Sequence, residues 1–248
     1  MAYKSLKIER FDTYVKLIIA RPEKQNSISA ELLREINHIL DEVESDPKCK
    51  CVIIEGSEEI FCTGLDFDDI SSFKEDVIRK WTSLYMSTLK RFTTSPKVII
   101  SKITGKTIAG GVGLAAASDI IIANEKASFK LSEAIFGLLP AMVSPFLIRR
   151  IGFQKAYSMM LLTNTIHAQE AHQIHLIDLL NNDLEKAIIE LLFRFSRIES
   201  ETVKQGKQLF RKMWTITEEM EKTAIEQTTH LLLQSHIQQK ILNFHYQV

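Results

Sequence analysis

Cysteine is scarce in this sequence, and its 3 thiols are an odd number. A disulfide framework needs paired cysteines and an oxidising compartment, so this count argues against one and fits a reducing cytoplasm. The chain also lacks an apolar run of the roughly 18 residues that a membrane span requires. Its first residues, Met1 to Arg10, carry no apolar core of a secretory signal. We therefore expect a cytoplasmic chain with no membrane partner.

An excess of charge of one sign is lacking as well. The 31 Lys and Arg residues balance 31 Asp and Glu residues, so no overall field attracts nucleic acid. Of the 248 residues, 45% are hydrophobic and 25% are charged, which is ordinary for a soluble globular protein. A chain of this length buries a substantial core. It predicts one large domain, or a domain with a helical appendage.

Strands and helices alternate over about the first 122 residues. Segments 14–19, 51–54, 98–103 and 120–122 are rich in β-branched residues and predict strands. Ser29 is a suitable N-cap for a helix whose apolar residues recur at helical spacing as far as Val43, and 77–91 predicts a second helix. Segment 61–66 predicts a turn, and 114–118 a short helix. This order predicts an α/β fold with largely parallel strands.

A glycine turn, Ala109-Gly110-Gly111-Val112-Gly113, follows one strand and opens the short helix. Glycines let a ligand approach the peptide N–H groups, and a helix N-terminus suits a developing anion. A tight connection without a ligand explains the same residues. The dinucleotide pattern is excluded because the next strand begins at Ile120, too soon for a crossover helix. A phosphate loop is excluded because Ile100 stands where its first glycine belongs.

Three segments, in this order, resemble the crotonase (enoyl-CoA hydratase/isomerase) superfamily. They are Phe61-Cys62-Thr63-Gly64-Leu65-Asp66, then Gly105 to Asp119 around the glycine turn, then Ala127-Ser128-Phe129 through Glu133 to Gly137-Leu138-Leu139-Pro140. Arg21-Pro22 and Ala168-Gln169-Glu170-Ala171 support the match, which keeps its register over about residues 5–180.

The resemblance implies a crotonase (ClpP-like) spiral of ββα units over residues 1–193, which would hold the active site. A C-terminal helical region, 194–248, would trimerise, and the assembly would be a homotrimer or hexamer. The ligand implied is an acyl-CoA or acyl carrier protein thioester. The backbone N–H groups of Leu65 and Gly110 align with the family's oxyanion hole, and Glu133 aligns with a catalytic carboxylate. The residues implied to bind substrate are Asp66, Phe67, Asp68 and Gly111.

One departure from the family bears directly on the chemistry. Hydratases of this family carry two glutamates, and the second aligns with Gly113, which has no side chain to activate a water. Members that keep only the later glutamate include enoyl-CoA isomerases. Ordinary hydration by two carboxylates is therefore not expected.

A closer resemblance is carried by segments 129–141 and 145–152. They look like the dehydratase of bacterial polyketide β-branching cassettes, which combines Ala-Gly-Gly-x-Gly with Leu-Ser-Glu. This implies a lyase of antibiotic biosynthesis that converts a 3-hydroxy-3-methylglutaryl group on an acyl carrier protein into the 3-methylglutaconyl thioester. Glu133 would take the α-proton and return it to the departing hydroxyl. The alternatives are a Δ3,Δ2-enoyl-CoA isomerase with one catalytic glutamate and a non-catalytic crotonase-fold binding subunit.

Metal and cofactor chemistry is not expected. His167, His172, His175 and Glu170 cluster in the sequence, but their segment aligns with a structural helix-turn of the family. The substrate itself would carry the phosphopantetheine or CoA. A distal carboxylate would call for a cation, for which Lys106, Lys130, Arg79 and Lys80 are candidates. Docking of an acidic carrier would call for a basic face such as Lys204, Lys207, Arg211 and Lys212, although an ordinary solvated helix surface is the favoured interpretation of these residues.

Overall fold

Two β-sheets organise the chain, and the strands between residues 51 and 130 belong to them alternately. The computed structural model describes residues 3–70, 72–214 and 216–245. The larger sheet has the order β1 (Leu6–Arg10), β2 (Tyr14–Ile19), β3 (Cys51–Glu55), β5 (Val98–Ile103), β7 (Ile120–Ala123), β10 (Leu179–Leu180). The smaller sheet has the order β4 (Ile60–Cys62), β6 (Lys106–Ile108), β8 (Ser128–Lys130), β9 (Ile166–His167). Strands β3, β5 and β7 are each followed by a strand of the smaller sheet and then by a helix, which confirms the ββα spiral.

The strands pair mainly in parallel, as the sequence predicts. Only the β1–β2 and β8–β9 pairs are antiparallel among the named strands of the described residues. Parallel neighbours bring the carboxyl ends of β4 and β6 to one edge of the smaller sheet. Their following turns, which contain Leu65 and Gly110, therefore lie together.

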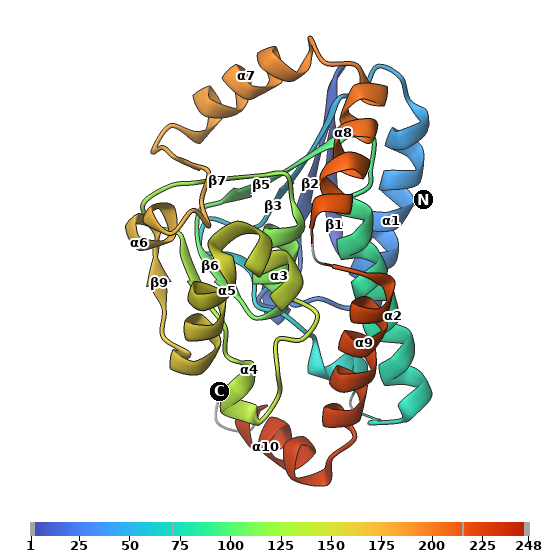
Figure 1. Cartoon of the computed structure of the whole chain (residues 1–248), viewed down its shortest axis with the longest axis vertical. Helices are drawn as coiled ribbons and strands as arrows, with labels where there is room; N and C mark the ends of the chain where they lie inside the picture. Colours follow the sequence, from blue (N-terminus) through green and yellow to red (C-terminus); the bar gives the residue numbers. More distant parts are fainter. Residues whose placement is uncertain (1–2, 71, 215, 246–248) are drawn as a thin grey trace.

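Helices cover the sheets on several sides (Figure 1). In chain order they are the single turn η1 (Pro22–Lys24), α1 (Ala30–Ser45), η2 (Phe67–Ile70), α2 (Glu75–Phe92), α3 (Gly110–Ala117), α4 (Glu133–Phe136), α5 (Ser144–Leu162), α6 (Ala168–Gln173), α7 (Leu184–Phe195), α8 (Ser200–Met213), α9 (Glu218–Leu232) and α10 (Ser235–His245). Helix α1 begins as predicted, since the Ser29 side chain accepts a hydrogen bond from the Leu32 N–H. No helix in the described ranges is long and apolar enough to cross a membrane.

Two predicted boundaries are wrong. The short helix predicted to begin at Leu114 begins one turn earlier, at Gly110, because the glycines form its first turn instead of a loop before it. The segment predicted as a turn begins with strand β4 (Ile60–Cys62), which is too short to show an alternating pattern. Both corrections matter for the site, since they place free helix N–H groups against a strand end.

The C-terminal helices fold back onto the body of the same chain. Helix α9 lies along α2, where the Thr82 and Thr229 hydroxyls are 3.2 Å apart and Lys90 lies 2.8 Å from Glu221 (Figure 1). Helix α10 packs against α4, with Ile237 beside Gly137. The division of the chain at residue 193 stays a prediction. Residues beyond position 193 also line a cavity in the body of the chain.

Candidate active site

A mostly apolar cavity lies between the turns that carry Leu65 and Gly110, helix α4 and helix α9. Its volume is about 90 Å³, several times the roughly 10–15 Å³ that one water needs. Its walls come from the turn after β4, from α2, from the start of α3, from segment 132–143 and from α9. The lining residues are Thr63, Leu65, Phe67, Trp81, Tyr85, Ala109, Gly110, Ser132, Glu133, Phe136, Leu138, Leu139, Pro140, Ala141, Met142, Val143, Thr228 and Leu232.

Leu65 and Gly110 present backbone N–H groups at neighbouring positions. A Cβ built on Gly64 would lie 3.0 Å from the Gly110 nitrogen, so the two turns are in contact. Gly64 has φ +91°, a conformation that favours glycine. Neither the Leu65 nor the Gly110 N–H donates to an acceptor within the described ranges. Since Gly110 opens α3, its N–H also carries the partial positive charge of a helix N-terminus.

Ala109 holds the Gly110 peptide in a strained conformation. Its φ of 49° and ψ of −119° lie in a region that non-glycine residues rarely adopt. Such strain costs on the order of 1–3 kcal/mol and persists only where the surroundings impose it. Here the Ala109 N–H donates to the Lys130 carbonyl at 2.9 Å, and Gly111 fits closely against the Cys62 carbonyl. The peptide that supplies the second donor is therefore held from both sides.

A buried ion pair fixes the turn that carries Leu65. The Arg21 guanidinium lies 2.6 Å from the Asp66 carboxylate, and the two side chains are 13% and 5% exposed. The Ile28 N–H donates to the Gly64 carbonyl, and the Asp66 N–H donates to the Ile28 carbonyl. Ile28 thus holds the backbone on both sides of Leu65, and the Arg21–Asp66 ion pair fixes the residue that follows it.

We expect Asp66→Asn to lower the free energy of unfolding by about 1.5–3 kcal/mol, because it removes the negative partner of a buried guanidinium. Urea denaturation measures the change. Unaltered stability together with a raised KM would instead give Asp66 the substrate-binding role that the sequence predicts.

Glu133 is the carboxylate in the cavity wall. It is the first residue of α4, and although the residue as a whole is half-buried, its Oε2 atom is shielded from solvent and has no hydrogen-bond partner within the described chain. Burial raises the pKa of Glu133 to about 7, and the backbone N–H groups of Glu133 and Ser132 oppose the shift. A carboxyl with this pKa can both accept and return a proton near neutral pH.

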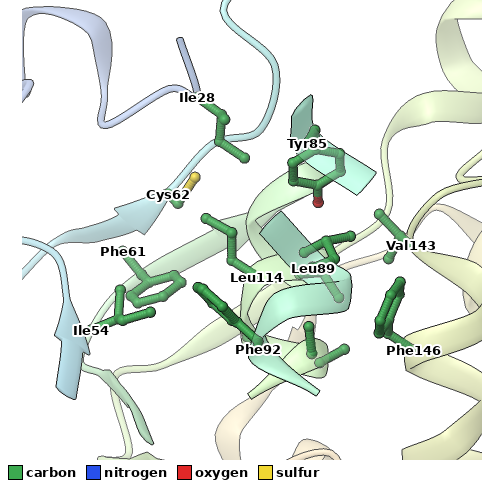
Figure 2. Packing of buried hydrophobic residues seen from close by; sticks show 14 of the residues in the cluster. Ile28, Ile54, Phe61, Cys62, Tyr85, Leu89, Phe92, Leu114, Val143 and Phe146 are labelled. Atoms are coloured by element: carbon green, nitrogen blue, oxygen red, sulfur yellow. The ribbon is translucent and has the colours of Figure 1, made fainter. Parts of the chain in front are cut away.

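Tyr85 fills the space in which a second carboxylate would stand. A Cβ on Gly113 would lie 2.1 Å from the Tyr85 hydroxyl oxygen and 3.0 Å from Val143. Figure 2 shows Tyr85 with Ile28 on one side and Val143 on the other. The hydroxyl donates to the Gly110 carbonyl at 2.6 Å, and burial raises its pKa well above the ordinary range, so it stays protonated. The absence of a side chain at position 113 is therefore a packing requirement of this core.

The structure brings some of the predicted site residues together and not others. Leu65, Gly110, Glu133 and Phe67 line the cavity. Asp66, Asp68 and Gly111 do not: Asp66 pairs with Arg21, Asp68 pairs with Lys24, and Gly111 packs on β4. Their role in binding substrate stays a prediction.

The cations proposed from the sequence lie elsewhere. None of Lys106, Lys130, Arg79 and Lys80 lines the cavity. In the predicted basic face, Lys207 is 2.6 Å from Asp119 and Arg211 pairs with Glu221, so these two charges are neutralised within the chain. No group of three metal-ligating side chains occurs among the described residues, and the histidine cluster therefore does not form one.

Trp81, Tyr85 and Thr228 are among the lining residues that were not found from the sequence. Trp81 and Tyr85 lie on the buried face of α2, and their helical spacing signals burial without indicating a site. Thr228 lies on α9, in a polar stretch that carries no motif. Cys62, close by, is fully buried, and burial raises its pKa to about 12, so it packs as an uncharged thiol.

Solved enoyl-CoA hydratases share this spiral over nearly the whole chain. The enzyme from Bacillus halodurans superposes with a TM-score of 0.89 and covers 97% of this chain and 100% of its own, at 22% sequence identity. That likeness defines the fold, which is the crotonase fold.

Sequence comparison extends the assignment from fold to family. Residues 11–245 match the enoyl-CoA hydratase/isomerase family. The bacillaene synthase dehydratase PksH of Bacillus subtilis is 35% identical over 223 residues, which are 86% of this chain and 83% of that protein. The crystal structure of the polyketide biosynthesis enoyl-CoA hydratase PksH from Bacillus subtilis has a TM-score of 0.89 at 32% identity, covering 99% of this chain and 98% of its own. The chain belongs to the enoyl-CoA hydratase/isomerase family, and it is a lyase-type enzyme that acts on an acyl thioester.

Proposed function

We propose that this enzyme dehydrates a 3-hydroxy-3-methylglutaryl thioester on an acyl carrier protein to the 3-methylglutaconyl thioester, in polyketide β-branching. The observation that carries the proposal is one buried carboxylate, Glu133, in a cavity where Tyr85 occupies the place of a second. The similarity to a protein named as a dehydratase of polyketide synthesis supports the direction of the reaction and the carrier. The proposed β-branching step extends that similarity to a particular substrate.

The proposed reaction uses one carboxylate twice. Ionised Glu133 takes a proton from the carbon next to the thioester carbonyl, and the carbonyl oxygen becomes an enolate oxygen held by the N–H groups of Leu65 and Gly110. The electron pair then returns to form the double bond as the C3–oxygen bond breaks. Protonated Glu133 gives its proton to the departing hydroxyl, which leaves as water from the same face. Glu133 ends ionised, and no cofactor is consumed.

The pH dependence of the reaction follows from the raised pKa of Glu133. The free enzyme is active only when this carboxyl is ionised, and its pKa is about 7. We expect kcat/KM to rise about tenfold per pH unit below pH 7 and to level off above about pH 8. Initial rates across pH 5 to 9 measure this. A profile that is flat through pH 7 would assign the proton transfer to another group.

The substrate class and its carrier can be tested directly. The purified enzyme is incubated with the 3-hydroxy-3-methylglutaryl group on acyl carrier protein, with the same group on CoA, and with a 3-enoyl-CoA, followed by mass spectrometry and ultraviolet absorbance. Loss of one water from the carrier-bound group is the expected result. Double-bond migration in the 3-enoyl-CoA, with no loss of water from either 3-hydroxy-3-methylglutaryl thioester, would instead indicate an isomerase. Inactivity with all three would indicate a binding role.

A Δ3,Δ2-enoyl-CoA isomerase is the second candidate, because a specific observation favours it. The cavity walls within the described residues contain no Lys or Arg to pair with a distal carboxylate, and most of the lining side chains are apolar. One carboxylate that takes and returns a proton also suits movement of a double bond.

We propose that the enzyme assembles as a homotrimer or hexamer in the cytoplasm. Large apolar side chains are exposed on three helices of the single chain, and burying them would require a partner surface. They are Phe153, Leu161 and Leu162 on α5, Ile189 and Phe193 on α7, and Leu209, Phe210 and Met213 on α8. Light scattering coupled to gel filtration tests this, and a monomer at micromolar concentration would contradict it.

A further inference from the structure

Thr228 places an unpartnered hydroxyl in the wall of the cavity. The residue lies on α9 and is 8% exposed, and its Oγ1 atom is buried with no hydrogen-bond partner within the described residues. Buried hydroxyls in helices usually bond to the carbonyl one turn earlier. Thr82 does so, since its Oγ1 donates to the Ile78 carbonyl at 3.0 Å. Thr228 does not, which leaves its hydroxyl without a partner in a residue that lines a mostly apolar cavity.

Three other polar groups of the cavity wall have already used their hydrogens. The Tyr85 hydroxyl donates to the Gly110 carbonyl, the Trp81 indole N–H donates to the Ile28 carbonyl, and the Thr63 hydroxyl donates to the Gln25 carbonyl. The Thr228 hydroxyl is therefore available to a bound ligand where these three hydrogens are not. An unsatisfied buried hydroxyl costs folding free energy, so its retention in a well-packed wall calls for a reason.

A purely structural role is poorly supported by the contacts of α9. The adjacent Thr229, 1% exposed, makes the hydroxyl contact to Thr82 that joins α9 to α2. Glu221 of the same helix pairs with Lys90 and Arg211. These contacts attach the helix without Thr228, whose hydroxyl adds nothing to the attachment.

We propose that Thr228 is a specificity-determining residue whose hydroxyl binds an oxygen of the acyl chain beyond the α-carbon. The cavity then selects oxygen-bearing acyl groups over hydrocarbon groups of the same shape, because a hydrocarbon leaves the hydroxyl unpaired. The oxygen is either a 3-hydroxyl or an oxygen of a distal carboxyl group, and both accept a hydrogen bond from Thr228. The inference rests on the proposed function only in that the cavity holds the acyl group.

Binding of unreactive analogues tests the inference separately from dehydration. Replacing the thioester sulfur by NH gives pantetheine amides that keep the carbonyl oxygen but whose α-proton is too weakly acidic to be removed. Two matched pairs are compared by calorimetry: 3-hydroxybutanoyl with 3-methylbutanoyl, and glutaryl with 5-methylhexanoyl. In each pair, methyl groups replace the oxygens at nearly constant shape. The expected result is that at least one oxygen-bearing member binds about tenfold more tightly than its hydrocarbon partner.

Two variants of Thr228 then assign the preference. Thr228→Val keeps the shape and removes the hydroxyl, so the preference should vanish, while the melting temperature is unchanged or raised because an unpaired buried group is gone. Thr228→Ser should retain the preference, and Thr229→Val, a neighbour outside the cavity, should retain it too. Equal binding within both pairs by the unaltered enzyme would overturn the proposal, as would a preference that survives in Thr228→Val. Neither outcome depends on whether the enzyme dehydrates the methylglutaryl group.

Discussion

Replacing Glu133 by Gln should lower kcat by about 10²–10⁴-fold, the usual contribution of a positioned acid–base group. The amide keeps the shape of the side chain but can neither take the α-proton nor return it. Because the donors of Leu65 and Gly110 and the apolar walls remain, the dissociation constant of a substrate amide should change little. Single-turnover kinetics and calorimetry separate these two effects.

The same variant should be more stable than the unaltered enzyme at alkaline pH. The pKa of Glu133 is about 7 in the folded protein against an ordinary 4.5, so the folded state holds this proton more tightly than the unfolded state. Its contribution to stability is complete below pH 4.5 and is lost as the pH rises through 7. At pH 8, Glu133→Gln removes the buried charge and should raise the melting temperature. Glu125→Gln, the same change at an exposed position, should alter neither activity nor stability. Wild-type turnover by Glu133→Gln would remove Glu133 from the mechanism.

Installing the family's second carboxylate should unfold the protein instead of converting it into a hydratase. In Gly113→Glu, the Cβ alone would lie 2.1 Å from the Tyr85 hydroxyl oxygen, and the carboxylate would be buried among apolar side chains. Overpacking and an unpaired buried charge together should cost more than about 5 kcal/mol, a large share of the stability of a typical domain. Soluble yield and urea denaturation measure the loss.

Gly206→Glu is the matched control, since no atom lies within 4 Å of a Cβ built there on α8. This change should not lower the free energy of unfolding and can raise it through the better helix propensity of Glu.

A smaller probe is Gly113→Ala, which should lower the free energy of unfolding by about 1–3 kcal/mol. Tyr85→Phe should relieve part of that cost, because the closest contact then becomes Val143 at 3.0 Å. Additive effects of these two changes, or a stable Gly113→Glu protein that hydrates enoyl thioesters, would refute the packing argument.

The sequence predicts the donors and the carboxylate of the site better than its walls. Leu65, Gly110 and Glu133 lie in the three segments that resemble the crotonase superfamily, and the structure places all three at one cavity. The strands of the smaller sheet were missed because segments of 3 residues, such as Ile60–Cys62 and Lys106–Ile108, cannot display an alternating pattern.

The sequence did not predict the other residues of the site, because contacts between distant segments bring them together. Tyr85 lies on α2 and Gly113 on α3, and only tertiary packing shows that one occupies the space of the other. Thr228 reaches the cavity because α9 folds back along α2, whereas the apolar faces of the tail predicted only a subunit interface. Charge patterns misled for a related reason: Lys207 looks solvated on a helix surface, but it is buried beside Asp119.

The arrangement of the two amide donors and the single acid is tested most directly by a crystal structure with the bound glutaryl amide analogue. The account predicts that its carbonyl oxygen lies within about 2.7–3.1 Å of both the Leu65 and the Gly110 nitrogen, with a Glu133 oxygen beside the α-carbon. A carbonyl that contacts neither nitrogen, or a Glu133 side chain turned away from the α-carbon, would contradict it.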